Sequence, residues 1–359
     1  MADLVLGLAT SHTPLLSLAP ELWAAYAQGD QRNQELSYPP NGIVLPYQQG
    51  EQYVSEEIKA KFKGAEPYAD QAQRCQRSLD ILAETLQSVR PDITIIVSDD
   101  QDEWLYEDNM PMFSLYWGET VPLRPMEFGG PMRGTPVAEA IQRGYGDVAM
   151  DVPVAHRFGR HTLEYLLDHD FDMAHMTYTR DSYSGRVARR YPTPDGELKY
   201  VRETAPKAQG LPHGFAFVVK RLYDNQPGAI LPIMQNTCYP PNTPSARRSF
   251  ALGQAIAGAV KAWSEPARVA IVASGGLSHF VVDEENDRKV LGGLQNKDAE
   301  ALTSVPRERL YSAGSESLNW VAVGGALQNT DLQMELLDYV PVYRTPAGTG
   351  GGWAFARWQ

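Results

Sequence analysis

The chain has 359 residues, of which 43% are hydrophobic and 21% are charged, and its formal net charge at pH 7 is −12. This length supports one large core or two smaller ones, and the acidic balance disfavours nucleic acid and anionic membrane surfaces as partners. No apolar run approaches the roughly 18 residues that cross a bilayer. The two cysteines are too few for a disulfide framework, so we expect a reducing, cytoplasmic location.

Short apolar runs bounded by breakers predict strands, and stretches with helical spacing of apolar residues predict helices between them. In chain order the expected strands are 4–9, 93–97, 173–178, 215–219, 230–234 and 269–273, and the expected helices are 71–88, 135–145, 160–167, 245–263 and 317–326. This alternation predicts an α/β fold with a central mixed sheet flanked by helices. No internal boundary is evident, so residues 1–359 are expected to form a single domain.

Three stretches do not fit this alternation, namely 26–64, 119–134 and 181–210, which are polar or rich in proline and glycine. Long loops inside a compact domain are uncommon and often serve as lids or binding loops. We therefore expect candidate lids here, with arms that contact a partner as the simpler interpretation.

Three of the seven histidines, His12, His213 and His279, lie beside glycine, serine or proline in expected loops. His12 and His279 each follow a predicted strand. In open α/β sheets, ligands bind beyond the carboxyl ends of the strands. Histidines gathered there from distant parts of the chain predict a metal or acid–base site.

The predicted strand 93–97 ends in a burst of polar groups, Asp99-Asp100-Gln101-Asp102-Glu103. One interpretation is a metal-facing loop, in which an extended chain would point Gln101 and Glu103 to the same side. The simpler interpretation is a solvated turn whose acids cap a helix. A second acidic run at 283–287 would, by itself, be the exposed start of a helix.

At these residues the chain resembles the class III extradiol ring-cleavage dioxygenases, and within them the catalytic (beta) subunits of the protocatechuate 4,5-dioxygenase and gallate dioxygenase type. The Gly275-Gly276-Leu277-Ser278-His279 loop is the most specific segment of the resemblance. The other matching segments are Ser11-His12-Thr13-Pro14, 91–103, 111–115, His213-Gly214, 239–241, 250–253 and Ala313-Gly314-Ser315-Glu316. Residues 26–64 and 181–210 look like insertions without a counterpart.

The resemblance implies a mononuclear Fe(II) held by two histidines and one glutamate, a ligand set that leaves positions open for substrate and O₂. It assigns His12 as the first ligand and Glu285 as the glutamate. It also implies that one of His213 and His279 is the base toward a catechol hydroxyl and that the other stabilises charge on bound oxygen. The implied partners are a small aromatic substrate, O₂, and further copies of the chain or a small helical subunit.

The family's second histidine ligand falls on Gln101 in this sequence, with Glu103 nearby as an alternative ligand. Oxygen ligands favour Mg, Ca or Mn over iron, so another divalent metal stays open beside Fe(II). Two further hypotheses stay open with it. The first is a metal-dependent hydrolase or carbon–carbon lyase that uses no O₂. The second is a non-catalytic subunit, against which the retained His12, Glu285, His213 and His279 argue.

Overall fold

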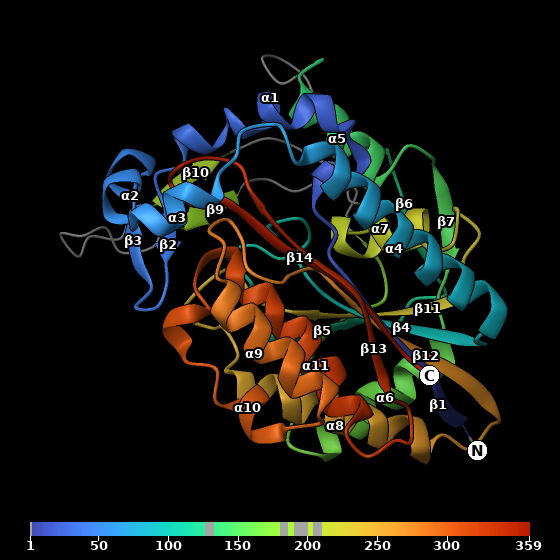
Figure 1. Cartoon of the computed structure of the whole chain (residues 1–359). Helices are drawn as coiled ribbons and strands as arrows, with labels where there is room; N and C mark the ends of the chain where they lie inside the picture. Colours follow the sequence, from blue (N-terminus) through green and yellow to red (C-terminus); the bar gives the residue numbers. More distant parts are fainter. Residues whose placement is uncertain (1, 126–132, 180–185, 190–199, 204–209) are drawn as a thin grey trace.

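Eight strands form one mixed sheet through the computed structural model, in the order β13-β14-β1-β12-β4-β11-β5-β8 (Figure 1). The structure describes residues 2–125, 133–179, 186–189, 200–203 and 210–359. Strands β1, β12, β4 and β11 run parallel in the centre, and β14 and β5 pair antiparallel at either side of them. The strands are β1 (Ala2–Thr10), β4 (Ile93–Asp99), β5 (Phe113–Tyr116), β8 (Ala174–Met176), β11 (Ala229–Gln235), β12 (Ala267–Ser274), β13 (Met334–Tyr343) and β14 (Gly350–Trp358).

Helices cover both faces of this sheet, and the central strands are therefore apolar on both sides. In β4, Ile95 and Val97 belong to the core on one face, whereas Ile96 belongs to the core on the other. A strand buried on both faces has a continuous apolar run rather than an alternating one. The helices α4 (Tyr68–Val89) and α7 (His213–Arg221) cover one face, and α5 (Pro136–Tyr145) packs on α7. The other face is covered by α6 (His156–Asp168), α8 (Ala246–Ala262), α9 (Glu284–Gln295), α10 (Ala299–Thr303) and α11 (Ser317–Leu327).

Most predicted elements are present, but one has the wrong type. The apolar run 215–219 was expected as a strand and instead lies inside α7, buried all round. A short apolar run of this kind has no periodicity that separates a buried strand from a buried helix. The short β5 and the hairpin of β13 and β14 were not predicted.

Two glycine positions explain how α8 and α11 approach so closely. The pair Gly324-Gly325 lies inside α11. A Cβ at Gly325 would lie 2.1 Å from the carbonyl oxygen of Phe250, and one at Gly253 would lie 1.7 Å from that of Ala322. Glycine is therefore required for this contact, and the contact fixes the position of α11, the helix that follows Glu316.

The segment 26–64 is ordered rather than a plain loop. It continues from α1 (Trp23–Ala27) through the hairpin of β2 (Leu36–Tyr38) and β3 (Ile43–Leu45) to α2 (Tyr47–Tyr53) and α3 (Glu56–Lys61). A small apolar cluster joins it to Val281 and Ala347. It thus packs against the turn between β13 and β14.

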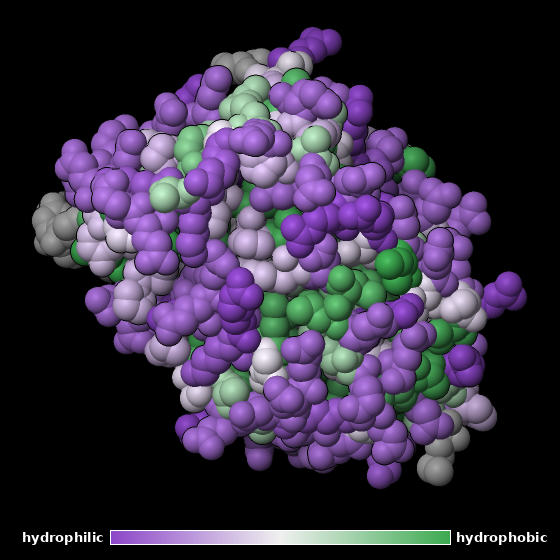
Figure 2. Space-filling view, in the orientation of Figure 1, coloured by the Kyte–Doolittle hydropathy of each residue, from purple (hydrophilic) through white to green (hydrophobic). Residues whose placement is uncertain are grey.

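The other two irregular stretches are described only in part. In 119–134, β6 (Thr120–Leu123) pairs with β7 (Met150–Pro153), and 126–132 lie outside the described residues. In 181–210, only the paired backbones of β9 (Arg186–Arg189) and β10 (Tyr200–Glu203) and the residue at 210 are described. Within the described residues, none of the helices has the length and apolar character to cross a membrane. Hydrophilic residues cover most of the face in Figure 2.

Candidate metal centre and acid–base site

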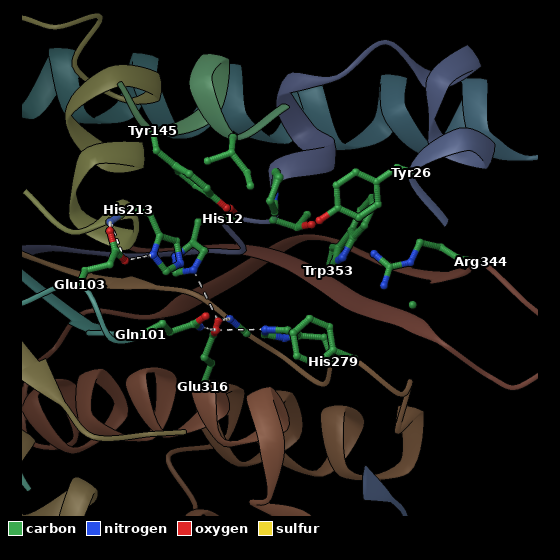
Figure 3. A pocket seen from close by; sticks show the side chains of 16 residues that line it. His12, Tyr26, Gln101, Glu103, Tyr145, His213, His279, Glu316, Arg344 and Trp353 are labelled. Carbon is green, nitrogen blue, oxygen red and sulfur yellow. Dashed lines mark hydrogen bonds and ion pairs between the residues drawn. The ribbon is translucent and has the colours of Figure 1, made fainter. Parts of the chain in front are cut away.

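A cavity of about 340 Å³ lies at the carboxyl ends of β1, β4 and β12, the edge at which the sequence predicts a site. The residues that line it come from segments far apart in the chain (Figure 3). They include five of the six predicted site residues, which are His12, Gln101, Glu103, His213 and His279.

His12 follows β1 and is held in one tautomer by its surroundings. Its Nδ1 lies 3.1 Å from Ser274 Oγ, and that hydroxyl donates its hydrogen to the carbonyl of Gly214 at 2.6 Å. Ser274 must therefore accept from His12, so Nδ1 carries the ring hydrogen and Nε2 presents a lone pair. Burial is the main reason that the pKa of His12 is lowered to about 3, which keeps this neutral form.

The Nε2 lone pair of His12 faces a carboxylate. Glu316 Oε2 lies 3.6 Å from it, and Glu316 is only 1% exposed. Ligand atoms of His12, Asp99 and Glu316 all lie within 4.8 Å of one another. A lone pair and two buried acids at this spacing repel each other unless a cation or a proton lies between them.

Gln101 bridges the two acids of this cluster. Its Nε2 donates to Asp99 Oδ2 at 2.9 Å and to Glu316 Oε1 at 2.6 Å. Asn319 donates to the other oxygen of Asp99 at 3.1 Å. In this arrangement Gln101 supplies hydrogen-bond donors to the carboxylates, and its amide oxygen is directed away from them.

The assignment of Glu285 requires correction, because the structure does not bring this residue to the cluster. Its side chain is 83% exposed in the first turn of α9 and pairs with Arg309 at 2.7 Å. The acidic run at 283–287 starts a helix, as the simpler interpretation expects, and Asp283 caps α9 by accepting from the backbone of Asn286. The run is not exposed as a whole, because only Glu285 is exposed and Asp287 is buried. Glu316 takes the place expected for Glu285.

The glycine loop after β12 shapes the site around Glu316. The backbone N–H of Gly276 donates to Glu316 Oε2 at 2.7 Å. Gly275 has a φ of +113°, and a Cβ there would lie 2.6 Å from the same oxygen. Only glycine combines this backbone conformation with so close an approach to the carboxylate.

His279, at the end of this loop, carries a proton on each ring nitrogen. Nε2 donates to Glu316 Oε1 at 3.0 Å, and Nδ1 lies 3.2 Å from the carbonyl oxygen of Leu277, which can only accept. Burial lowers the pKa of His279, but the charge of Glu316 and the hydrogen bond to it outweigh burial and raise the pKa above its ordinary value.

His213, the first residue of α7, is paired with Glu103. Its Nδ1–H and its backbone N–H both contact the Glu103 carboxylate. Burial lowers the pKa of His213, but Glu103 outweighs burial and raises the pKa to about 9. Among the described residues none bonds to His213 Nε2, so that nitrogen is directed to whatever enters the cavity.

The acids after β4 divide into distinct roles. Asp100 accepts from three backbone N–H groups, those of Glu103, Trp104 and Leu105, and so builds the turn. The chain is not extended here, yet Gln101 and Glu103 both line the cavity. Burial and then the charge of Glu316 raise the pKa of Asp99 to about 7.

The donor set fits a divalent cation. One imidazole nitrogen and two carboxylates converge, all three residues are buried, and the Nδ1–H of His12 is held by an acceptor, as is usual for metal-ligating histidines. Because the pKa of Asp99 is raised to about 7, the metal-free cluster holds a proton below that pH, and metal binding commonly displaces such a proton.

A comparison with protein families identifies the family to which the chain belongs. Residues 61–350 match the family described as the catalytic LigB subunit of aromatic ring-opening dioxygenase. The match covers most of the chain, which therefore belongs to this family. It includes the positions of Asp99, Gln101, His213, His279 and Glu316.

One curated protein and one solved structure are similar to parts of the chain. A gallate dioxygenase of Pseudomonas putida KT2440 is 33% identical over 131 residues, which cover 33% of this chain and 38% of that protein. The aligned part is therefore well under half of that relative's length. A solved structure, uncharacterized protein JW3007 from Escherichia coli K12, is 13% identical, with a TM-score of 0.44 over 79% of this chain and 91% of that one.

Proposed function

We propose that this chain is a metal-dependent dioxygenase that opens a catechol- or gallate-like ring beside the diol, by extradiol cleavage. The observation that carries the proposal is the convergence of His12, Glu316, His213 and His279 on one cavity in a chain of the ring-opening dioxygenase family. The partners are then a small aromatic diol and O₂.

For the metal we propose His12, Glu316 and Asp99 as the protein ligands, with Gln101 as the donor that holds the two carboxylates together. Fe(II) is the metal that the family resemblance implies, while two oxygen ligands out of three also suit Mn(II). When bound, the metal supplies open positions for the diol oxygens and for O₂. Asp99 then supplies the third protein ligand, in place of the family histidine whose position Gln101 occupies.

The two remaining histidines receive different roles because their carboxylate partners differ. Glu316 would share its charge with a bound cation, which weakens its hold on the His279 proton. Glu103 lies outside the ligand set and keeps His213 protonated at neutral pH. We therefore assign His279 as the base toward a catechol hydroxyl and His213 as the donor that stabilises negative charge on oxygen.

The test is oxygen uptake by protein reconstituted without air with Fe(II), and separately with Mn(II), against protocatechuate, gallate, an O-methylgallate and simple catechols. Uptake together with a new yellow absorbance is the expected result. No uptake across the panel with metal bound would contradict the proposal.

A second candidate function rests on Gln101 and the oxygen-rich donor set. A cation held by His12, Asp99 and Glu316 could act as a Lewis acid for hydrolysis or carbon–carbon cleavage without O₂. The same panel under nitrogen separates the two, since this candidate requires turnover without oxygen.

Replacing Ser274 by alanine is expected to weaken metal binding by about 10- to 100-fold, because His12 loses the acceptor that fixes its tautomer and ring orientation. Competition against a fluorescent chelator measures the affinity. Ser78→Ala is the matched control, since Ser78 is a buried serine on α4 that bonds only within its own helix. An affinity within about two-fold of the parent protein would contradict the role given to Ser274.

Replacing Glu103 by glutamine is expected to shift the alkaline limit of activity to lower pH. His213 has a raised pKa of about 9, so its protonated form is present below that pH and is lost as pH rises through it. Without the Glu103 charge the pKa falls by at least about 1 unit, and the limit moves with it. The pH profile of oxygen uptake checks this, with Glu164→Gln on the surface of α6 as the control. An unmoved limit would remove His213 from the donor role.

We also propose a cytoplasmic protein that works as a homo-oligomer, with or without a small helical partner subunit. Both of its cysteines are unpaired, and Cys75 is buried in the core, which suits a reducing compartment. Light scattering coupled to size-exclusion chromatography tests the oligomeric state.

A further inference from the structure

One buried amide behind the cavity has no role in the proposed reaction. Asn319 is fully buried in the first turn of α11, the helix that Glu316 precedes. This helix packs on β12 and β4, the strands that end at Ser274 and Asp99. Asn319 is not among the residues that line the cavity, so its contacts are with the protein and not with a substrate.

The side chain of Asn319 donates two hydrogen bonds toward the ligand cluster. Its Nδ2 donates to Asp99 Oδ1 at 3.1 Å and to the backbone carbonyl oxygen of Ser274 at 3.1 Å. Asp99 is a proposed ligand, and Ser274 is the residue whose hydroxyl accepts from His12 Nδ1. Because Glu316 lies at the start of the same helix, Asn319 joins all three proposed ligands, either directly or through one residue.

A second buried amide fixes the direction of the Asn319 side chain. Gln235, at the end of β11, donates through Nε2 to the backbone carbonyl oxygen of Leu318 at 3.2 Å and to Asn319 Oδ1 at 3.0 Å. A carbonyl oxygen can only accept, so the nitrogen of Gln235 must face this way. The oxygen of Asn319 is then occupied as an acceptor, and its N–H groups are directed to Asp99 and Ser274.

This orientation has an energetic cost. Gln235 is only 1% exposed, and its Oε1 has no partner among the described residues. An unsatisfied buried oxygen destabilises the fold, whereas an apolar side chain of the same shape would fill the space without that penalty. A role in orienting Asn319 explains why a glutamine is found here.

We propose that Asn319 is a positioning residue that holds the three metal ligands in one arrangement, and that Gln235 acts on the metal only through Asn319. The inference rests on the proposed function, because His12, Asp99 and Glu316 are the ligands there. With Asn319 on Oδ1 and Gln101 on Oδ2, both oxygens of Asp99 accept a hydrogen bond, which fixes the plane of this carboxylate. Each oxygen still has a lone pair for a cation.

The experiment is competition between the full-length chain and a fluorescent chelator for Mn(II) and, under nitrogen, for Fe(II). Asn319→Leu removes the polar atoms at similar volume, and we expect it to weaken metal binding by about 10- to 100-fold. Gln235→Met is expected to weaken binding by a smaller factor. The double variant should bind no more weakly than Asn319→Leu alone, because Gln235 acts only through Asn319.

The variant Asn319→Leu is expected to fold, because the groups that lose Asn319 keep other hydrogen bonds. The carbonyl oxygen of Ser274 still accepts from Ser98, and Asp99 still accepts from Gln101. Thermal unfolding of the metal-free protein checks this. If Asn319→Leu does not fold, Gln235→Met carries the test, and an unchanged affinity in that variant would overturn the inference.

Asn286→Leu is the matched control. Asn286 is a buried asparagine of α9 that lies outside the cavity, and its side-chain oxygen has no partner among the described residues. The visible spectrum of Co(II)-loaded protein supplies a second readout, since it reports the arrangement of the ligands. It should change in Asn319→Leu and stay the same in Asn286→Leu, whereas a loss of stability alone would leave it unchanged in both.

Three results would overturn the inference. They are an affinity within about two-fold of the parent protein in folded Asn319→Leu, a double variant in which the two losses add, and a parent protein that binds neither metal.

The outcome is separable from that of the proposed function, because metal affinity is measured without turnover. An affinity that depends on Asn319, without oxygen uptake on any diol, would retain the positioning role and refute the dioxygenase. Oxygen uptake together with an affinity insensitive to Asn319 would do the reverse.

Discussion

Replacing Glu316 by glutamine is expected to remove tight metal binding, and with it all activity, whereas the same change at Glu285 is expected to alter neither. Glu316 contributes a buried anionic oxygen 3.6 Å from His12 Nε2, while the Glu285 carboxylate is exposed and paired with Arg309. Loss of the hydrogen-bond partner of a metal ligand lowers metal affinity by about 10- to 100-fold. Loss of the ligand itself should therefore lower the affinity by more.

Metal content after dialysis and titration calorimetry measure this difference directly, without reliance on turnover. Glu316 also accepts from Gly276, Gln101 and His279, so thermal unfolding of the metal-free variant is needed to establish that it folds. Metal retained in Glu316→Gln and lost in Glu285→Gln would reverse the assignment.

Replacing His213 by asparagine is expected to lower kcat by about 10²- to 10⁴-fold, the range that a positioned acid–base group contributes. The substrate should still bind, since the proposed contacts to the diol lie elsewhere, so KM should change little. Metal content should stay the same, because His213 packs edge-on against the ring of His12 and is not one of the proposed metal ligands.

Steady-state oxygen uptake, with kcat and KM resolved separately, checks this second result. His161→Asn is a suitable control, since the Nε2–H of that histidine donates to the carbonyl oxygen of Ala259 in α8 and the residue lines no part of the cavity. A loss confined to KM would indicate that His213 positions substrate instead of stabilising charge in the reaction.

The class of fold could be predicted from the sequence because its central strands and long helices carry strong signals. The strands β1, β4, β11 and β12 are apolar runs bounded by breakers. Helix α5 lies within the predicted range 135–145, and the side chain of Thr135 caps it by accepting from the backbone of Ala138. The prediction of a strand at 215–219 was wrong, because a segment buried on all sides has no alternation of apolar and polar residues that separates a strand from a helix. The hairpin of β13 and β14 was missed because its strands are interrupted by proline, glycine and charged residues.

The candidate site could be predicted only in part, because its residues come from segments that lie far apart in the chain. His12, His213 and His279 were recognisable from their loops. Glu316 lies within a segment that resembles the family, but the acidic run at 283–287 offered a more conspicuous glutamate. Nothing local marks Asp99 over its neighbours, because its role depends on which segments meet in space.

The position of β1 in the sheet has a consequence for how the protein is made. This strand, which presents His12, pairs on one side with β12 and on the other with β14, more than 260 residues further along the chain. At synthesis rates of roughly 5–20 residues per second, β1 leaves the ribosome more than about ten seconds before either neighbour exists. During that interval the N–H and C=O groups along both of its edges are unpaired and open to other nascent chains. The cluster of His12, Asp99 and Glu316 can form only after Glu316 has been translated.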